Sequence, residues 1–409
     1  MTCLLTDRNS TSENALIPRA RLEHVTEADI QQLIDHGVRE GRTLDYKRDW
    51  PTSPQERARI AEDVCAFANT LGGDLVFGLD EQEGVATAIV PIPLKDVDAA
   101  LREVTSAIRD LHEPKITSGL QPWAVSIASG GYVVVLRVAV SPNAPHRTTT
   151  KNHFYGRTSV GKEPMDMHAI RHAFASNTSL VDQVLARREA TLQSILTHTS
   201  PAPQLAGPTC VCQIVPLAAI TRPQLHDVDM LRSAARRLEI AGPGQINLHP
   251  PTINLDGVAC ISDRVDHVFR AYAQLYRNGS VELVAGDLSR CIVPQRGDEE
   301  VRAIFPDLYE VPLVRTGFPA MLDALAELDV APPAYLMLSW TYTGRTLVAV
   351  QQRGAEIYAP LPDHIQTMVA PPIYLESFDI DPLTTLRPAF DVFWNAVGIA
   401  HTQTDFARR

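Results

Sequence analysis

The sequence predicts an α+β protein made of two domains. Helical and strand-like segments are interspersed along both halves, and 409 residues are enough for about two domains that each bury a core. A stretch rich in proline, serine and threonine, at 197–209, marks a linker. We therefore expect a flexible tail at 1–21, a first domain at 22–176, a connecting helix and linker at 177–209, and a second α+β domain at 210–405.

The first domain is predicted to begin with a helix and a strand. Thr26 is an N-cap residue before an apolar stripe, and Gly41 is positioned just beyond the end of this helix. The next segment, "RTLDYK", alternates as a strand does. Leu44 and Tyr46 therefore face one side of the strand, while Asp45 faces the other.

A second helix and a second strand follow. Ser53 caps the helix in "SPQERARIAEDVCAFANTLGG", with Pro54 in its first turn and glycines at its end. "DLVFGLD" is a strand that ends at Asp80. The remaining elements are a helix at 93–112, a hairpin at 122–140 that turns at Gly130–Gly131, a short strand at 153–159 and a closing helix at 165–177.

The second domain is predicted from one strong turn signal and several periodic segments. Asn278 and Gly279 lie between two strand-like runs, which is typical of a β-hairpin. Further strands are expected at 210–217, 334–344 and 346–354, and helices at 229–240, 318–328 and 386–399.

The composition argues against several classes of protein. Apolar residues make up 45% of the chain and charged residues 21%, as in ordinary globular proteins, and no apolar run is long enough to span a membrane. The N-terminal residues lack the order of a secretory signal, and the six cysteines lack the paired spacing of a structural zinc site. We therefore expect a cytoplasmic protein with reduced thiols and no membrane partner. The formal charge of −11 argues against indiscriminate nucleic-acid binding.

Three acids in the first domain form the candidate site. Glu40 and Asp45 lie on either side of Gly41, which permits a bend that brings them together, and Asp80 follows the next strand. Two like charges at about 4 Å repel by about 1 kcal/mol in water and by about 4 kcal/mol near a protein surface. A gathered cluster of acids therefore needs a retained proton or a cation.

A divalent cation held by such acids suits phosphodiester cleavage. It can polarise a phosphoryl oxygen, generate a hydroxide and stabilise the leaving oxygen. Lys47, two residues from Asp45 on the same face of the strand, is positioned to hold the scissile phosphate. The residues alone leave a second interpretation open, in which Glu40 and Asp45 are exposed acids beside basic neighbours and Asp80 begins a turn.

Four motifs resemble, in order and spacing, those of the Schlafen AlbA_2 domain over about residues 25–175: Glu40 followed by "LDYK", then "AFANTLGGDLVFGLDE", "SPNAPH" and "FYGRTSVGKEPMDMHAIRHAF". The resemblance implies an AlbA-like α+β fold that binds nucleic acid. It also implies a metal-dependent endoribonuclease site acting on tRNA and rRNA, with Glu40, Asp45 and Asp80 as catalytic acids and as ligands of Mg²⁺ or Mn²⁺. Lys47 is the fourth catalytic candidate. Bacterial domains of this kind are similar to components of anti-phage defence.

One position departs from the family pattern, and the family leaves activity open. Asp45 stands where the family has Glu, which shortens the carboxylate arm by one methylene. A metal tolerates this change if the backbone moves closer or a water intervenes. Many proteins with this domain are DNA-binding regulators, so a non-catalytic regulator that binds DNA or RNA is the alternative function. A scaffold in a defence or regulatory assembly is a third.

Contacts to nucleic acid are expected from a locally basic region, because phosphate binding needs well-placed positive charge. Basic residues outnumber acids between 145 and 171. The predicted contacts are Arg42, Arg48, His146, Arg147, Lys151, Arg157 and Lys162. For His146 the alternative is a loop histidine bonded to backbone, and Asn69 is expected to order a helix end. Because Schlafen cores pair two related lobes and this chain shows one, we expect a homodimer.

Overall fold

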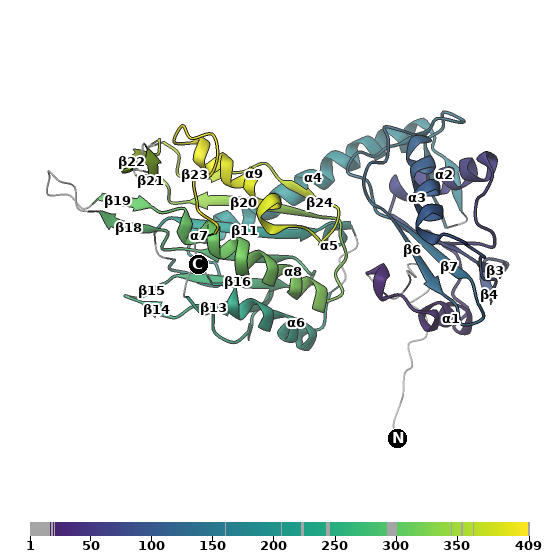
Figure 1. Ribbon diagram of the computed structural model, residues 1–409, viewed down its shortest axis with the longest axis horizontal. Coiled ribbons are helices and arrows are strands. Elements are labelled where there is room, and N and C mark those ends of the chain that lie inside the picture. Colours follow the sequence, from purple (N-terminus) through teal and green to yellow (C-terminus); the bar gives the residue numbers. More distant parts are fainter. Residues whose placement is uncertain are drawn as a thin grey trace, which may run out of the picture. The chain divides into compact units, whose positions relative to one another are not determined.

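The computed structural model describes residues 17, 19, 21–159, 161–205, 207–221, 225–242, 246–292, 301–344, 346–352, 355–362 and 364–407. The chain divides into two compact units, Met1–Asp182 and Gln183–Arg409, shown from purple to teal and from teal to yellow in Figure 1. Both units combine helices with sheets, which confirms the α+β class. None of the described helices is both long enough and apolar enough to cross a membrane.

A four-stranded sheet forms the centre of the first unit. In the order β1-β2-β7-β6, its strands are Leu44–Lys47, Gly73–Phe77, Tyr132–Val138 and Leu120–Ser126. β1 runs parallel to β2, and the other neighbours are antiparallel. The alternation predicted for β1 is confirmed, since Leu44 and Tyr46 are buried against α1 (Glu27–Asp35) and leave Asp45 on the opposite face.

Two helices cover that opposite face. α2 (Pro54–Ala68) and α3 (Val97–Asp110) lie across the sheet in Figure 1. Ser53 and Glu56 form a reciprocal capping box at the start of α2, as the Ser53 cap predicted. Ile60, Val64 and Phe67 then pack into the core between α2, α3 and the sheet. This packing also holds the polar side chains of α2 that flank the apolar stripe next to β1.

One expectation for the N-terminal region is wrong. α1 ends at Asp35, and Gly37, with φ +57°, supplies the left-handed residue that Gly41 was expected to provide. The predicted tail at 1–21 lies mostly outside the described residues. Ile17, however, is 2% exposed, and its N–H donates to the buried Asp74 at 3.4 Å. Within the predicted tail, Ile17 is therefore held in the core of the first unit.

The shorter elements of the first unit complete its surface. Gly130 and Gly131 both have positive φ at the turn between β6 and β7, as predicted. The other elements are η1 (Leu22–His24), β3 (Leu79–Gln82), β4 (Val85–Ile89), β5 (His112–Glu113), β8 (Arg147–Thr148), β9 (Tyr155–Arg157) and β10 (Lys162–Pro164).

A single helix of 30 residues, α4 (Met167–Leu196), replaces the predicted closing and connecting helices. No proline or glycine interrupts this stretch, so the helix has no local reason to end. The boundary between the two units, at Asp182 and Gln183, consequently falls within α4 and before the linker predicted at 197–209.

The second unit is built on an eight-stranded antiparallel sheet. Its order is β12-β13-β16-β17-β11-β20-β23, and β24 also pairs with β20. The strands are Thr252–Ile253, Gly257–Ile261, Ala271–Tyr276, Val281–Ala285, Thr209–Pro216, Ala334–Thr341, Thr367–Val369 and Ile373–Leu375. The hairpin predicted at Asn278–Gly279 is confirmed between β16 and β17.

Helices cover both faces of this sheet. α6 (Val228–Ala235), α8 (Phe318–Glu327) and α9 (Pro382–Asn395) bury the larger core, and the C-terminal half of α4 packs on the other face. A smaller sheet, β18-β19-β21-β22, comprises Ser289–Ile292, Val301–Ile304, Leu347–Gln352 and Ala355–Pro360. The remaining elements are α5 (Ala218–Thr221), η2 (Arg236–Ile240), α7 (Asp307–Pro312), η3 (Leu313–Gly317), β14 (Arg264–Val265) and β15 (Val268–Phe269).

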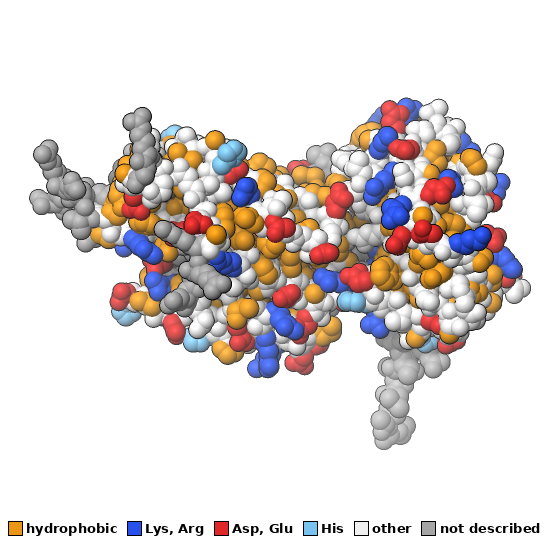
Figure 2. Space-filling model, in the orientation of Figure 1, with side chains coloured by type: hydrophobic (Ala, Val, Ile, Leu, Met, Phe, Trp, Pro, Cys, Tyr) orange, Lys and Arg blue, Asp and Glu red, His pale blue; other side chains and the backbone are white. Residues whose placement is uncertain are grey.

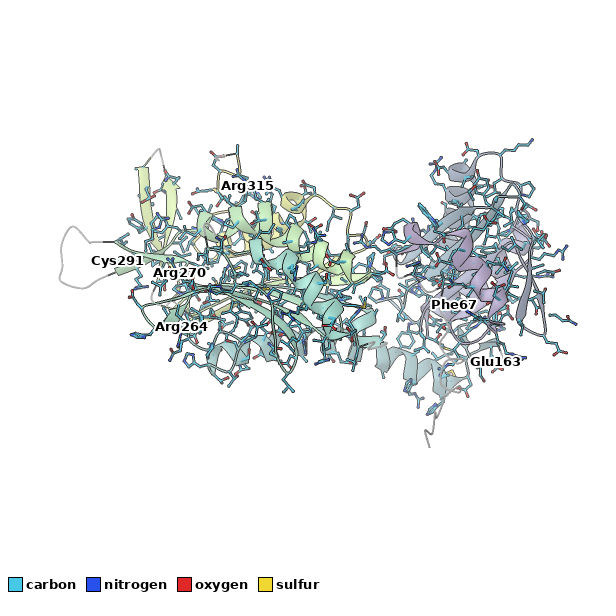
Figure 3. All side chains as sticks on the ribbon, turned by 90° about the horizontal axis from the view of Figure 1, so that it is seen from below. Phe67, Glu163, Arg264, Arg270, Cys291 and Arg315 are labelled. Atoms are coloured by element: carbon cyan, nitrogen blue, oxygen red, sulfur yellow. The ribbon has the colours of Figure 1, made fainter. Side chains whose placement is uncertain are left out.

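The cysteines of the described residues are free thiols, as expected. Cys65 lies in the core of the first unit, and Cys210, Cys212 and Cys260 are buried in the second. Cys291 is exposed on β18, at the position labelled in Figure 3.

A buried carboxylate on α7 makes the stability of the second unit depend on pH. Glu310 accepts hydrogen bonds from Trp394 Nε1 at 2.8 Å and from Thr402 Oγ1 at 2.6 Å. Burial nevertheless raises its pKa to about 7. The pKa of Glu310 is thus higher in the folded state than in the unfolded state. Its contribution to the free energy of unfolding is therefore fully present below pH 4.5 and is lost as the pH rises through 7.

We therefore predict that Glu310→Gln flattens this pH dependence. Relative to the wild type, the variant should gain free energy of unfolding, on the order of 3 kcal/mol, between pH 4.5 and pH 8. Urea unfolding of both proteins across this range, followed by near-ultraviolet circular dichroism, measures the difference. Parallel curves for the two proteins would contradict the assignment.

Candidate functional site

A cavity of about 650 Å³ lies beside β1 in the first unit. Residues of β1, α2, β9 and β10 line it, together with the segment before β1 and the β3–β4 turn. Its lining includes five basic and four acidic side chains, so opposite charges share one cavity. These are Arg39, Glu40, Asp45, Lys47, Arg59, Asp63, Glu83, Arg157 and Lys162.

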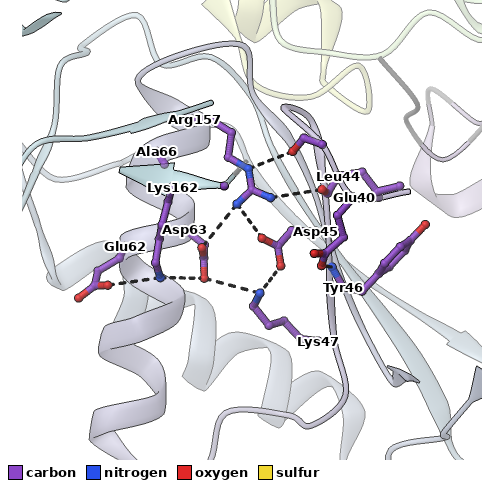
Figure 4. A network of polar contacts seen from close by, with 12 residues as sticks. Glu40, Leu44, Asp45, Tyr46, Lys47, Glu62, Asp63, Ala66, Arg157 and Lys162 are labelled. Atoms are coloured by element: carbon purple, nitrogen blue, oxygen red, sulfur yellow. Dashed lines mark hydrogen bonds and ion pairs between the residues drawn. The ribbon is translucent and has the colours of Figure 1, made fainter. Parts of the chain in front are cut away.

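Arg157, on β9, links the walls of this cavity (Figure 4). Its side chain is 3% exposed, and Nη1 lies 2.6 Å from Asp45 Oδ2 and 3.6 Å from Asp63 Oδ1. Nε donates to the Gly41 carbonyl at 3.1 Å, and Nη2 donates to the Leu44 carbonyl at 3.3 Å. One guanidinium thus joins α2, β1 and the segment before β1.

Two lysines complete the network. Lys47 Nζ bonds to Asp45 Oδ1 and lies 3.9 Å from Asp63 Oδ2. Lys162 Nζ lies 3.1 Å from Asp63 Oδ2 and 3.3 Å from Glu62 Oε2. Figure 4 shows Asp63 between the two lysines and Arg157, so one carboxylate of α2 contacts three cations.

Glu40 reaches the same cavity from the segment before β1. Its Oε1 accepts the backbone N–H of Tyr46 at 2.6 Å, and its own N–H donates to the Gly84 carbonyl at 2.7 Å. These two bonds fix Glu40 against β1 and against the β3–β4 turn. Glu40 and Asp45, five positions apart in the sequence, therefore line one cavity.

Burial and neighbouring charges together set the pKa values of these groups. Burial raises the pKa of Asp45, but the charges of Lys47 and Arg157 outweigh it and lower that pKa overall. Burial, followed by the charge of Asp45, raises the pKa of Glu40 and of Asp63. Burial lowers the pKa of Lys47, but Asp45 and Asp63 outweigh it and raise that pKa overall. Asp45 and Lys47 are therefore an ion pair at neutral pH.

Asp80 is not among the residues that line the cavity. Gly78, with φ +93°, turns the chain out of the sheet, so Asp80 lies in β3 and not at the end of β2. Its Oδ2 lies 2.7 Å from Arg48 Nη1. The structure thus brings two of the three predicted acids together and pairs the third with one of the predicted nucleic-acid contacts.

His146 is fully buried, so its ring is not at the surface where a nucleic-acid contact was expected. Nδ1 lies 2.6 Å from the Pro114 carbonyl, and Nε2 lies 2.7 Å from Ser141 Oγ. Burial lowers its pKa to about 4, which keeps the ring neutral. Asn69 bonds to the backbone of His146 and to the Tyr155 carbonyl, so it orders the end of α2 as expected.

The other predicted contacts lie at the surface, in the cavity or in ion pairs. Arg42 is exposed. Arg147 Nη2 lies 2.5 Å from Glu113 Oε2, and Lys151 Nζ lies 2.7 Å from Glu62 Oε1. Figure 2 shows basic and acidic side chains interspersed on the visible face of this unit. Paired charges of this kind attract a polyanion less than isolated cations do.

Sequence reasoning missed five charged residues of this region: Arg39, Arg59, Glu62, Asp63 and Glu83. Glu62 and Asp63 are the only acids within the otherwise apolar run "IAEDVCAFA", and that contrast is the signal that could have identified them. Arg39 and Arg59 line the cavity, but their places in the sequence carry no comparable signal.

The predicted metal ligands fit a divalent cation only in part. Among the described residues, no three or more His, Cys, Asp or Glu side chains are grouped to hold a metal ion. Glu40 and Asp45 nevertheless line one cavity, and Mg²⁺ is commonly bound through one or two carboxylates, with waters and substrate phosphates as the other ligands. Carboxylate oxygens are also the donors that this ion prefers. Of the predicted ligands, Glu40 and Asp45 are therefore the two that would hold the ion, with Asp45 Oδ1 exchanging Lys47 for it.

The fold and the cavity define an α+β domain with a charged, partly buried site. Residues 40–166 match the family model described as Schlafen, AlbA_2, and this stretch of the chain is a Schlafen AlbA_2 domain. The match confirms the resemblance carried by the four motifs. Domains of this family are associated with nucleic-acid processing.

Similar solved structures match only part of the chain. The DIP2311 protein from Corynebacterium diphtheriae is 17% identical over 34% of this chain and 29% of its own, with a TM-score of 0.25. The N-terminal domain of a putative ATP-dependent DNA helicase RecG-related protein from Nitrosomonas europaea is 20% identical over 33% of this chain and 90% of its own, also with a TM-score of 0.25. No curated protein matches the chain.

We predict that Arg157→Ala strongly destabilises the first unit. The substitution leaves Asp45 and Asp63 buried without the guanidinium that joins them, which typically costs about 3–5 kcal/mol. The matched control is Arg147→Ala, because Arg147 is 38% exposed and its pair with Glu113 is worth under about 1 kcal/mol. Chemical unfolding of both variants measures the effect, and equal losses would contradict the central position of Arg157.

Proposed function

We propose that this protein is an endoribonuclease that cleaves structured RNA, and that its substrate is tRNA. One observation carries the proposal. Within an AlbA_2 domain, carboxylates and cations from several segments converge on a single cavity. Cleavage of tRNA would halt translation, which is the basis for proposing a role in anti-phage defence. We also propose that two copies of the chain form the RNA-binding groove.

The residues of the cavity can bind and orient a phosphodiester. Lys47 and Lys162 are ammonium groups that can exchange a carboxylate partner for a phosphate oxygen, because both line the cavity. Arg157, bonded to two backbone carbonyls, keeps Asp45 in place during that exchange. When bound at Glu40 and Asp45, Mg²⁺ or Mn²⁺ would neutralise charge at the reacting phosphate.

Asp80 has an indirect role in this proposal. Its carboxylate pairs with the guanidinium of Arg48 at the surface and so limits how readily a phosphate further along the RNA can contact this arginine. Arg48 therefore contributes to RNA binding and Asp80 restrains it, whereas Glu40 and Asp45 contribute to turnover.

A non-catalytic regulator that binds DNA or RNA is the second candidate. The observation that favours it is the pairing of Asp45, Asp63 and Glu62 with protein cations. A network whose charges are already neutralised in this way can have a purely structural role, without taking part in a reaction. Nucleic-acid binding without cleavage under every metal condition would select this candidate.

We predict that Asp45→Asn abolishes cleavage. Purified protein incubated with total tRNA and Mg²⁺ or Mn²⁺ should yield discrete fragments, and a chelator should prevent their formation. Asp45→Asn should lower kcat by at least about 100-fold, since it removes a charge that acts at the reacting phosphate. Intact RNA with the wild-type protein, or equal cleavage by the variant, would contradict the proposal.

Asp80→Asn is the comparison variant in this assay. We expect it to lower KM while kcat changes little, because it removes the acid that a phosphate must displace from Arg48 without touching the cavity. Loss of kcat as complete as that of Asp45→Asn would show that Asp80 acts at the reacting phosphate.

A further inference from the structure

The basic residues of the cavity fall into two groups. Lys47, Arg157 and Lys162 form the inner group, and each of them contacts a carboxylate of β1 or α2. Arg39 and Arg59 form the outer group. Both outer arginines are exposed, and no ion pair joins either of them to another described residue.

The outer arginines come from two separately fixed backbone segments. Arg39 pairs with Val85 in an isolated β-bridge at the start of the segment that carries Glu40. Arg59 lies on α2, and its carbonyl accepts a hydrogen bond from Lys162 Nζ at 2.9 Å. Both backbones are thus fixed beside the cavity, Arg39 by this bridge and Arg59 by Lys162, while both residues stay exposed.

Charge pairing decides which of the exposed cations can bind a phosphate strongly. Arg48, Arg147 and Lys151 each contact an acid, at 2.7, 2.5 and 2.7 Å respectively. A phosphate that binds these groups must replace an existing partner. Arg39 and Arg59 require no such exchange, and a guanidinium binds phosphate through two parallel hydrogen bonds.

We propose that Arg39 and Arg59 bind the RNA backbone phosphates on either side of the one held in the cavity. This inference rests on the proposed function and names the residues that hold the strand at that site. The cavity volume of about 650 Å³ falls within the range of sites that enclose a ligand of nucleotide size. In this arrangement the inner cations act on one phosphate, and the outer arginines supply most of the salt-dependent affinity.

The test is the salt dependence of tRNA binding. Fluorescence anisotropy of labelled tRNA, measured in EDTA so that the RNA stays intact, gives log Kd against log salt concentration. The doubly substituted variant Arg39→Gln, Arg59→Gln should lower the slope by about 1.5, because each phosphate contact contributes roughly 0.7 to 0.9. Arg147→Gln is the matched control, a partly exposed arginine already paired with Glu113, and should keep the wild-type slope.

A charge-retaining variant separates charge from folding. Arg39→Lys, Arg59→Lys should keep most of the slope, because a lysine still neutralises a phosphate. A wild-type slope in the doubly glutamine-substituted protein, or an equal loss in Arg147→Gln, overturns the inference while leaving the proposed function intact. Failure of the wild-type protein to bind tRNA overturns both.

Discussion

The buried guanidinium of Arg157 is the constraint on which the first unit's cavity depends. A buried charge costs several kcal/mol unless it is paired and fully hydrogen-bonded. Arg157 meets that requirement with Asp45, Asp63 and the carbonyls of Gly41 and Leu44. The fold must therefore bring β1, α2 and β9 together at this position. Its stacking over Phe67, at 4.7 Å from the ring centroid, ties the charged network to the apolar core.

This pairing determines how the negative charge of the clustered acids is compensated. Clustered carboxylates require a proton or a counter-ion, and in this fold protein cations supply that charge. Lys47 and Arg157 hold the Asp45 pKa low, while burial leaves Glu40 and Asp63 with raised pKa values. The cavity is thus nearly neutral in the free protein. A phosphate enters by exchanging partners with cations already in place, which suits an acidic protein that does not bind polyanions indiscriminately.

The sequence contained enough local information to predict most of the fold and part of the site. Alternation in "LDYK" placed Leu44 in the core and Asp45 opposite it, and caps and glycines located α2 and the hairpins. Asp80 was not predictable in the same way, because a positive φ at Gly78 redirects the strand and no sequence pattern requires it. Asp63 lies on α2, far from Arg157 in the sequence, and only tertiary packing brings the two residues together. The burial of His146 was likewise decided by packing that places its ring between the Pro114 carbonyl and the Ser141 hydroxyl.

A crystal structure of Asp45→Asn with bound tRNA tests the central claim most directly, since this variant should retain the RNA without cutting it. The account predicts one backbone phosphate in the cavity, within hydrogen-bond distance of Lys47 and Lys162, with Arg157 still bonded to the carbonyls of Gly41 and Leu44. RNA bound elsewhere on the protein, with the cavity empty of phosphate, would contradict it.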